Sequence, residues 1–140
     1  MQRTILVVDD AEDFREMCAR YLLLEGFRVY VASNGLQAVN KACEILPSLI
    51  LMDLALPVMG GLEAIKRIKS DERTRHIPII LLTGQVRGGP AAVIEAQCEG
   101  FLVKPCALKQ IVEEIQRVLK RAKTEIRSDR AQAQEKKDNA

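Results

Sequence analysis

Five short apolar runs along the chain are separated by longer segments with a different pattern. The runs at 4–8, 49–53, 79–82 and 101–103 are almost continuously apolar, whereas 28–32 alternates polar and apolar residues. Continuous apolar runs of this length are typical of strands covered on both faces, and alternation is typical of a strand with one exposed face. The pattern therefore predicts five strands, with 28–32 at an edge of the sheet.

Amphipathic helices are predicted between these strands and after the last one. Apolar residues recur there every three or four positions, which is the spacing of one helix face. The predicted helices span 11–25, 34–46, 62–70, a segment that begins at Pro90, and 107–121. In the second helix we expect four residues to face the core: Leu36, Val39, Cys43 and Leu46.

The alternation of strands and helices predicts an α/β fold, a (βα)5 three-layer sandwich with helices on both faces of a parallel sheet. Right-handed crossovers and the edge position of 28–32 favour the flavodoxin-like strand order 2-1-3-4-5. In such sheets ligands bind beyond the carboxyl ends of the strands, at the switch point of the strand order. Here the switch point lies between the first and third strands.

Length and composition fit one domain with an aliphatic core, since the 140 residues are 48% apolar and only 4% aromatic. We expect a domain at 1–121 and a charged tail or linker at 122–140, which is either a helical extension or disordered. Seven basic and four acidic residues follow from Lys120 onward, so the first 119 residues carry a net charge of −1 against +2 for the whole chain. A nearly neutral body lacks the basic footprint of nucleic-acid binding, so no direct nucleic-acid partner is expected.

The cysteines contain no C-x-x-C motif, and they are Cys18, Cys43, Cys98 and Cys106. Because three of them lie in or beside helical stretches, we expect small buried thiols rather than disulfides or zinc ligands. No apolar run reaches the length of a membrane span, and the N-terminus has no apolar signal region. These features predict a cytoplasmic protein with no membrane partner.

Polar residues follow four of the predicted strands: Asp9-Asp10, Asp53, Thr83 and Lys104. Because the carboxyl ends of parallel strands meet at one edge of a sheet, these side chains are expected to converge. Three clustered carboxylates repel one another unless a cation or strong hydrogen-bond donors lie among them. Hard oxygen ligands without a nearby histidine or cysteine suit Mg²⁺. The sequence therefore predicts a magnesium site.

This constellation also predicts phosphoryl chemistry. A carboxylate beside Mg²⁺ and a lysine can attack phosphorus and become an acyl phosphate. Asp53 is the expected nucleophile, because it stands alone after a central strand with the acidic pair beside it. Lys104 adds a positive charge, and the Thr83 hydroxyl can donate to a phosphoryl oxygen.

Four motifs occur in order along the chain: ILVVDD, ILMDLALPVMGG, IILLTG and FLVKP. Together they make residues 3–121 resemble the CheY-like receiver domains of two-component response regulators. The resemblance implies that Asp53 accepts a phosphoryl group from a sensor histidine kinase or a histidine phosphotransfer protein. It also implies that Asp9, Asp10, Asp53 and the backbone carbonyl of Ala55 serve as magnesium ligands.

The resemblance further implies a phosphorylation-dependent signalling switch. In this family the lysine matching Lys104 pairs with the phosphoryl group, and the peptide before Pro105 is usually cis. The residues matching Thr83 and Phe101 move when the site is phosphorylated. Their movement changes the face made by helix 4 (the predicted helix that begins at Pro90), strand 5 (101–103) and helix 5 (107–121). That face is expected to bind a downstream protein or an output domain outside this chain, or to form a homodimer. Gly84 leaves access to the phosphoryl group open.

Two other interpretations remain at this point. The first is an Mg²⁺-dependent phosphatase or phosphotransferase with an aspartyl nucleophile that acts on an external substrate, as haloacid-dehalogenase-type enzymes do. Such enzymes require a second aspartate where Ala55 stands, and they usually carry a cap domain. The second is a scaffold that is never phosphorylated. We favour the switch, which is not an enzyme and catalyses only its own phosphoryl transfer and dephosphorylation.

Overall fold

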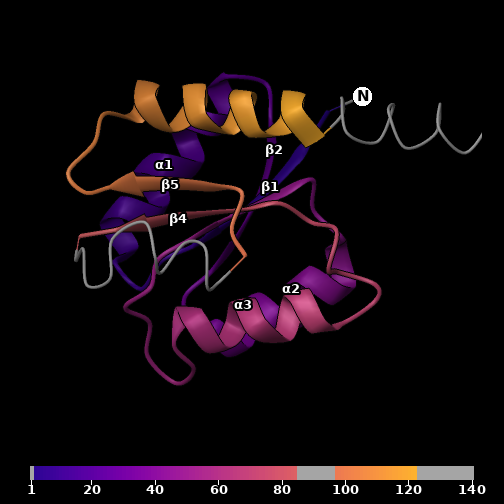
Figure 1. Cartoon of the computed structure of the whole chain (residues 1–140). Helices are drawn as coiled ribbons and strands as arrows, with labels where there is room; N and C mark the ends of the chain where they lie inside the picture. The colour runs from indigo at the N-terminus through magenta and orange to yellow at the C-terminus, as the bar shows by residue number, and fades with distance from the viewer. Residues whose placement is uncertain (1, 85–96, 123–140) are drawn as a thin grey trace, which may run out of the picture.

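The computed structural model describes residues 2–84 and 97–122. They contain a five-stranded parallel sheet in the order β2-β1-β3-β4-β5 (Figure 1). The strands are β1 (Thr4–Val8), β2 (Arg28–Ala32), β3 (Leu49–Met52), β4 (Ile79–Thr83) and β5 (Gly100–Val103). This confirms the predicted α/β fold, its strand order and the edge position of β2.

Helices cover both faces of the sheet. The labelled helices are α1 (Glu12–Leu24), α2 (Gly35–Ile45) and α3 (Gly61–Ser70). A further helix, here called the C-terminal helix, spans 108–122 and continues the chain after β5. One core cluster joins the sheet to α1 and the C-terminal helix, and the other joins it to α2 and α3 (Figure 1). The predicted helix from Pro90 lies outside the described residues, as does the predicted tail beyond 122.

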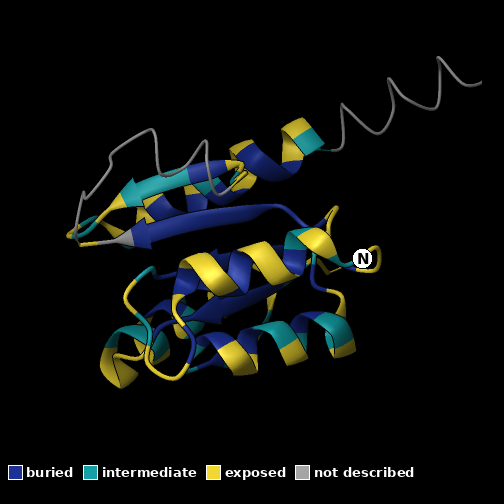
Figure 2. Ribbon diagram, turned by 60° about the horizontal axis from the view of Figure 1, so that its bottom comes forward, coloured by how far each residue is buried: buried dark blue, intermediate teal, exposed yellow. Residues whose placement is uncertain are grey.

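The central strands explain the continuous apolar runs. Along β1, Ile5 and Val7 pack toward α1, whereas Leu6 and Val8 pack toward α2 and α3. All four of these side chains are at most 1% exposed, and β3 is buried in the same way. Figure 2 shows the dark blue of buried residues in strands of the sheet and the yellow of exposed residues on the outer sides of the helices. A parallel strand with helices on both faces has no side for polar residues, which is why its sequence does not alternate.

The buried face of α2 differs from the prediction. Its buried residues are Gly35, Ala38 and Ala42, while Leu36 is 41% exposed and Leu46 is 53% exposed. The reason is close packing, because a Cβ at Gly35 would lie only 2.2 Å from the Met59 carbonyl oxygen. Small residues therefore lie on the buried face, and Leu36 and Leu46 point outward. Val39 packs against the core cluster as predicted, and Cys43 is partly buried.

The pairing register brings the ends of distant strands together. Val8 at the end of β1 lies opposite Met52 at the end of β3, so Asp9 and Asp53 leave the sheet side by side. Thr83 lies opposite Val103, which immediately precedes Lys104. The carboxyl edge of the sheet thus collects the residues that the sequence analysis selected.

No helix within 2–84 or 97–122 is both long enough and apolar enough to cross a membrane.

The start of α3 offers a stability test on two adjacent glycines. A Cβ at Gly61 would lie 2.4 Å from the Asp53 carbonyl oxygen and 2.8 Å from the Leu54 Cα, both backbone atoms. We expect Gly61→Ala to lower the free energy of unfolding by about 1–3 kcal/mol, measured by urea denaturation. Gly60→Ala is the matched control, because a Cβ there meets nothing within 4 Å, so only the poorer helix capping by alanine should lower the value, by less than about 1 kcal/mol. Equal denaturation midpoints for the two variants would contradict this packing.

Candidate functional site

The acidic loop after β1 begins with a buried carboxylate. Asp9 is 2% exposed, and its backbone N–H donates to the Ala32 carbonyl at 3.1 Å. Its Oδ1 accepts the Ala11 N–H at 2.9 Å, and its Oδ2 accepts a hydrogen bond from Lys104 Nζ at 2.5 Å. The loop is therefore held by the sheet on one side and by the start of α1 on the other.

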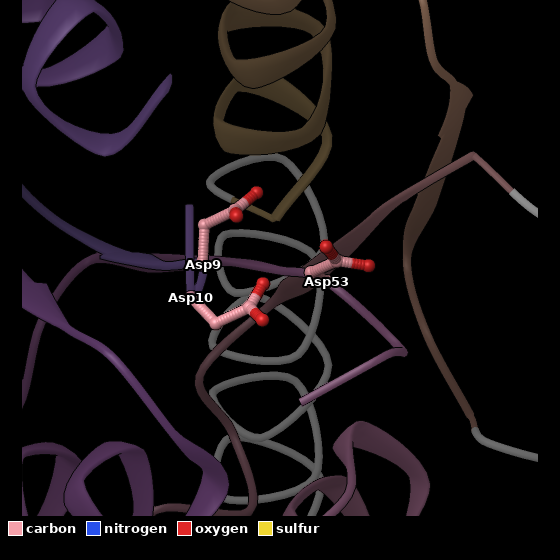
Figure 3. Close-up of side chains that lie close together, drawn as sticks. All are labelled: Asp9, Asp10 and Asp53. Carbon is pink, nitrogen blue, oxygen red and sulfur yellow. The ribbon is translucent and has the colours of Figure 1, made fainter. Parts of the chain in front are cut away.

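Asp53 lies opposite this loop. It is 8% exposed, and its backbone N–H donates to the Val8 carbonyl at 3.0 Å. Its Oδ1 accepts the Ala55 N–H at 3.2 Å. Carboxylate oxygens from Asp9, Asp10 and Asp53 all lie within 4.8 Å of one another (Figure 3). The fold thus brings together the three acids that the sequence analysis placed in one pocket.

Lys104 supplies positive charge to this cluster from the end of β5. Its Nζ lies 2.5 Å from Asp9 Oδ2 and 3.4 Å from Asp53 Oδ2. The lysine side chain is 24% exposed, so it is partly buried. The Lys104–Pro105 peptide bond is cis.

The electrostatics of the cluster follow from burial and attraction. Burial raises the pKa of the Asp53 carboxyl and repulsion from Asp9 adds to this, while the Ala55 N–H and Lys104 oppose the rise. For Lys104, burial would lower the pKa, but the hydrogen bond to Asp9 and the attraction of Asp53 raise it overall. The ionised Asp53 carboxylate therefore costs free energy in the folded protein, whereas the charged lysine is favoured.

Other predicted residues lie around this centre. The β4–β5 register places Thr83 next to the strand position before Lys104, and a Cβ at Gly84 would lie 3.9 Å from the Lys104 Cβ. Phe101 is partly buried and packs against the core cluster on the α2 and α3 side. The Ala55 side chain is exposed beside Asp53.

Two residues of α1 at the site were not selected by sequence reasoning. The Phe14 ring lies against the Lys104 ammonium, with 4.2 Å between Nζ and the ring centroid. Arg15 Nη1 donates to the Asp9 backbone carbonyl at 2.8 Å. Phe14 falls on the apolar stripe of its helix, which is the ordinary pattern of a core residue. The sequence therefore carries no signal that the Phe14 ring also contacts the Lys104 ammonium.

The donor set fits Mg²⁺. The three side chains present only carboxylate oxygens, which are hard ligands, and Asp10 is exposed enough to leave space for water. A cation would also relieve the mutual repulsion of the carboxylates and the cost of burying Asp53. Asp9, Asp10 and Asp53 can therefore hold a divalent metal ion.

The cysteines form no disulfide among the described residues. Burial raises the pKa of Cys18 and of Cys98 to about 12, which keeps both thiols protonated at neutral pH. Cys18 is buried as predicted, whereas Cys43, Cys98 and Cys106 are only partly buried.

A family model for the response regulator receiver domain matches residues 5–116. The chain belongs to this family. It is a CheY-like receiver domain of two-component signalling, and the motifs that suggested this assignment all lie within or at the edge of the matched region.

Relatives of this receiver domain agree with the assignment. The polar-differentiation response regulator DivK of Brucella anthropi is 32% identical over 120 residues, which cover 85% of this chain and 98% of DivK. The chemotaxis response regulator CheY4 of Vibrio cholerae has a TM-score of 0.79 at 28% identity, covering 84% of this chain and 99% of CheY4.

A third relative carries a metal. The receiver domain of the sensor histidine kinase PA1611 from Pseudomonas aeruginosa PAO1 is 32% identical, covers 85% of this chain and 98% of its own, and has a TM-score of 0.74. Its structure has a magnesium ion coordinated in the active-site cleft. The acidic cluster of the present receiver domain is likewise able to bind a metal.

The raised pKa of Asp53 predicts how metal and charge affect stability. A carboxyl whose pKa is higher in the folded state contributes stability below its unfolded pKa, and this contribution is lost as the pH rises through the folded pKa. At neutral pH without metal, Asp53→Asn should therefore raise the free energy of unfolding. Mg²⁺ at ten times its dissociation constant should stabilise the wild-type protein by about 1.4 kcal/mol, and the Asn variant by less.

Asp71→Asn is the control for this measurement. Asp71 is a carboxylate away from the cluster whose pKa is lowered to about 2 by its hydrogen bonds from Arg73. Its substitution should leave the response to Mg²⁺ unchanged in thermal unfolding followed by circular dichroism. Equal Mg²⁺ stabilisation of the wild-type and Asp53→Asn proteins would contradict the metal site.

Proposed function

We propose that this receiver domain is a phosphorylation-dependent switch in which Asp53 accepts a phosphoryl group from a phosphohistidine. The donor is a sensor histidine kinase or a histidine phosphotransfer protein. The observation that carries the proposal is the position of Asp53, whose carboxylate lies within 4.8 Å of Asp9 and Asp10 oxygens and 3.4 Å from Lys104 Nζ. This is the charge environment that transfer to a carboxylate needs.

The transfer itself requires little covalent chemistry from the protein. An Asp53 oxygen attacks phosphorus, the P–N bond of the phosphohistidine breaks, and its electron pair stays with the departing imidazole. The product is an acyl phosphate on Asp53. Lys104 neutralises charge on the phosphoryl oxygens, and Mg²⁺ held by Asp9, Asp10, Asp53 and the Ala55 carbonyl would add positive charge there. Attack by water later releases inorganic phosphate and restores the carboxylate, so no external substrate is turned over.

The proposed output is a change in the face made by helix 4, β5 and the C-terminal helix. A phosphoryl group adds three acceptor oxygens, which draw the Thr83 hydroxyl toward the site and let Phe101 rotate inward behind it. Support comes from the register that places Thr83 beside the residue before Lys104, and from the partial burial of Phe101. The predicted helix from Pro90, which is helix 4 of this face, lies outside the described residues. A downstream protein, an output domain or a second copy of the chain would bind this face.

The proposed function applies to one domain of the chain, followed by a segment of different composition. Residues 1–121 form the receiver domain, and 122–140 form a charged tail or linker. A histidine kinase as donor places the protein in the cytoplasm.

Phosphorylation of Asp53 has a direct test. Phosphoramidate with Mg²⁺ should add one phosphoryl group to the wild-type protein and none to Asp53→Asn, measured by intact-protein mass spectrometry. Asp71→Asn should be modified like the wild-type protein, since Asp71 is remote from the acidic cluster. The same adduct on the wild-type and Asp53→Asn proteins would refute the assignment. Continuous hydrolysis of small phosphomonoesters would instead support an enzyme that acts on an external substrate.

Lys104 should couple phosphorylation to the output face. We expect Lys104→Ala to bind Mg²⁺ but to lose most of the phosphorylation-dependent amide shifts in β5, observed by NMR after treatment with phosphoramidate. Allosteric coupling of this kind is typically worth about 5- to 150-fold in an equilibrium constant. Lys109→Ala, an exposed lysine on the C-terminal helix, is the control and should retain the shifts. A full set of shifts in Lys104→Ala would show that Lys104 does not have this role.

A further inference from the structure

The Lys104 ammonium contacts the aromatic ring of Phe14 as well as the carboxylates whose charge it balances. Phe14 in the first turns of α1 places its ring centroid 4.2 Å from Lys104 Nζ. A cation within about 6 Å of a ring centroid is attracted by the negative charge of the π face. Phe14 and Lys104 are far apart in sequence, so this contact exists only because α1 and the end of β5 meet beside the acidic cluster.

The three partners of the ammonium differ in chemistry, since two are hydrogen-bond acceptors and one is an aromatic ring. Asp9 and Asp53 accept its hydrogen bonds at 2.5 and 3.4 Å, while the Phe14 ring offers a face without any acceptor atom. Beside the ring and the lysine lies a shallow hollow, which is also lined by Met17, Pro105 and Cys106. The ring and the lysine side chain therefore share one partly open surface of the protein, beside the acidic cluster.

We propose that Phe14 is a positioning residue that holds Lys104 at the phosphoryl site and thereby speeds transfer to Asp53. This inference depends on the proposed function. A lysine side chain has large rotamer freedom, and an ammonium that must be recruited during the reaction contributes less than one already in place. The ring adds a third attractive contact to those of Asp9 and Asp53, so the ammonium stays beside Asp53 when the Asp53 oxygen attacks phosphorus.

A purely structural role for Phe14 predicts different behaviour. The ring also packs against the core cluster formed with α1 and the C-terminal helix, so its removal could act through packing alone. Leucine at position 14 keeps an apolar side chain but has no π face, whereas tyrosine and tryptophan keep the face. Replacement of Phe14 by trifluorophenylalanine keeps the shape and weakens the negative charge of the face. The electrostatic and packing effects can therefore be separated.

The experiment measures the rate of phosphoryl uptake from phosphoramidate with Mg²⁺, by intact-protein mass spectrometry. In this reaction the Asp53 oxygen bonds to phosphorus, and the P–N bond breaks with its electron pair on the departing ammonia. We expect Phe14→Leu to lower the rate by about five-fold, the size of a partly desolvated cation–π contact. The trifluorophenylalanine variant should also be slower, and Phe14→Tyr and Phe14→Trp should remain within about two-fold of the wild-type rate.

Tyr21→Leu is the matched control, because Tyr21 is a partly buried aromatic residue of α1 in the same core cluster. It should destabilise the protein without changing the rate. NMR supplies the signature of the contact, since the Lys104 Hε resonances should be shifted upfield by the ring in the wild-type protein and not in Phe14→Leu.

Each outcome decides the inference. A wild-type rate in Phe14→Leu or in the trifluorophenylalanine variant, or Lys104 Hε resonances that Phe14→Leu leaves unchanged, would overturn the role of Phe14 while leaving phosphorylation of Asp53 intact. A wild-type protein that takes up no phosphoryl group would overturn the proposed function and this inference together. Slow transfer in the leucine and trifluorophenylalanine variants, with rescue by tyrosine and tryptophan, supports it.

Discussion

The attraction between one ammonium and two buried carboxylates organises the carboxyl edge of the sheet. Asp9 and Asp53 are at most 8% exposed, and like charges so close together disfavour each other's ionised form. Lys104 lies within 2.5 Å of one and 3.4 Å of the other, and its raised pKa shows that attraction exceeds the cost of burying it. Removing Lys104 would leave two buried carboxylates without compensation, which is far more costly than losing a surface ion pair.

Small residues at the backbone make this arrangement of charges possible. At Gly61 there is no room for a Cβ beside the Asp53 carbonyl, and at Gly35 there is none beside the Met59 carbonyl. The loop between β3 and α3 can therefore fold back against the strand end that carries Asp53. The backbone of this loop therefore contacts both the start of α3, where Gly61 N–H donates to the Leu54 carbonyl, and the start of α2, where Gly35 N–H donates to the Met59 carbonyl.

Much of the fold and the acidic cluster could be predicted because both follow from short-range rules. Strands buried on both faces have continuous apolar runs, and parallel strands bring residues such as Asp9 and Asp53 to one edge. The buried face of α2 could not be predicted in this way. Hydrophobic periodicity selected Leu36 and Leu46, whereas the buried residues are Gly35, Ala38 and Ala42. Close approach of the Met59 carbonyl leaves no room for a Cβ at Gly35. Periodicity measures polarity and carries no information about the distance between helices.

The sequence by itself determined the element order, the strand order and the identity of the acids and the lysine at the sheet edge. Each of these follows from the periodicity of apolar residues or from the polar residue that ends an apolar run, and both can be recognised in short segments of the sequence. Only the tertiary structure decided that the Phe14 ring lies on the Lys104 ammonium and that Arg15 supports the Asp9 carbonyl. Those contacts depend on how α1 is placed against the end of β5, and this placement is set by the packing of the whole core.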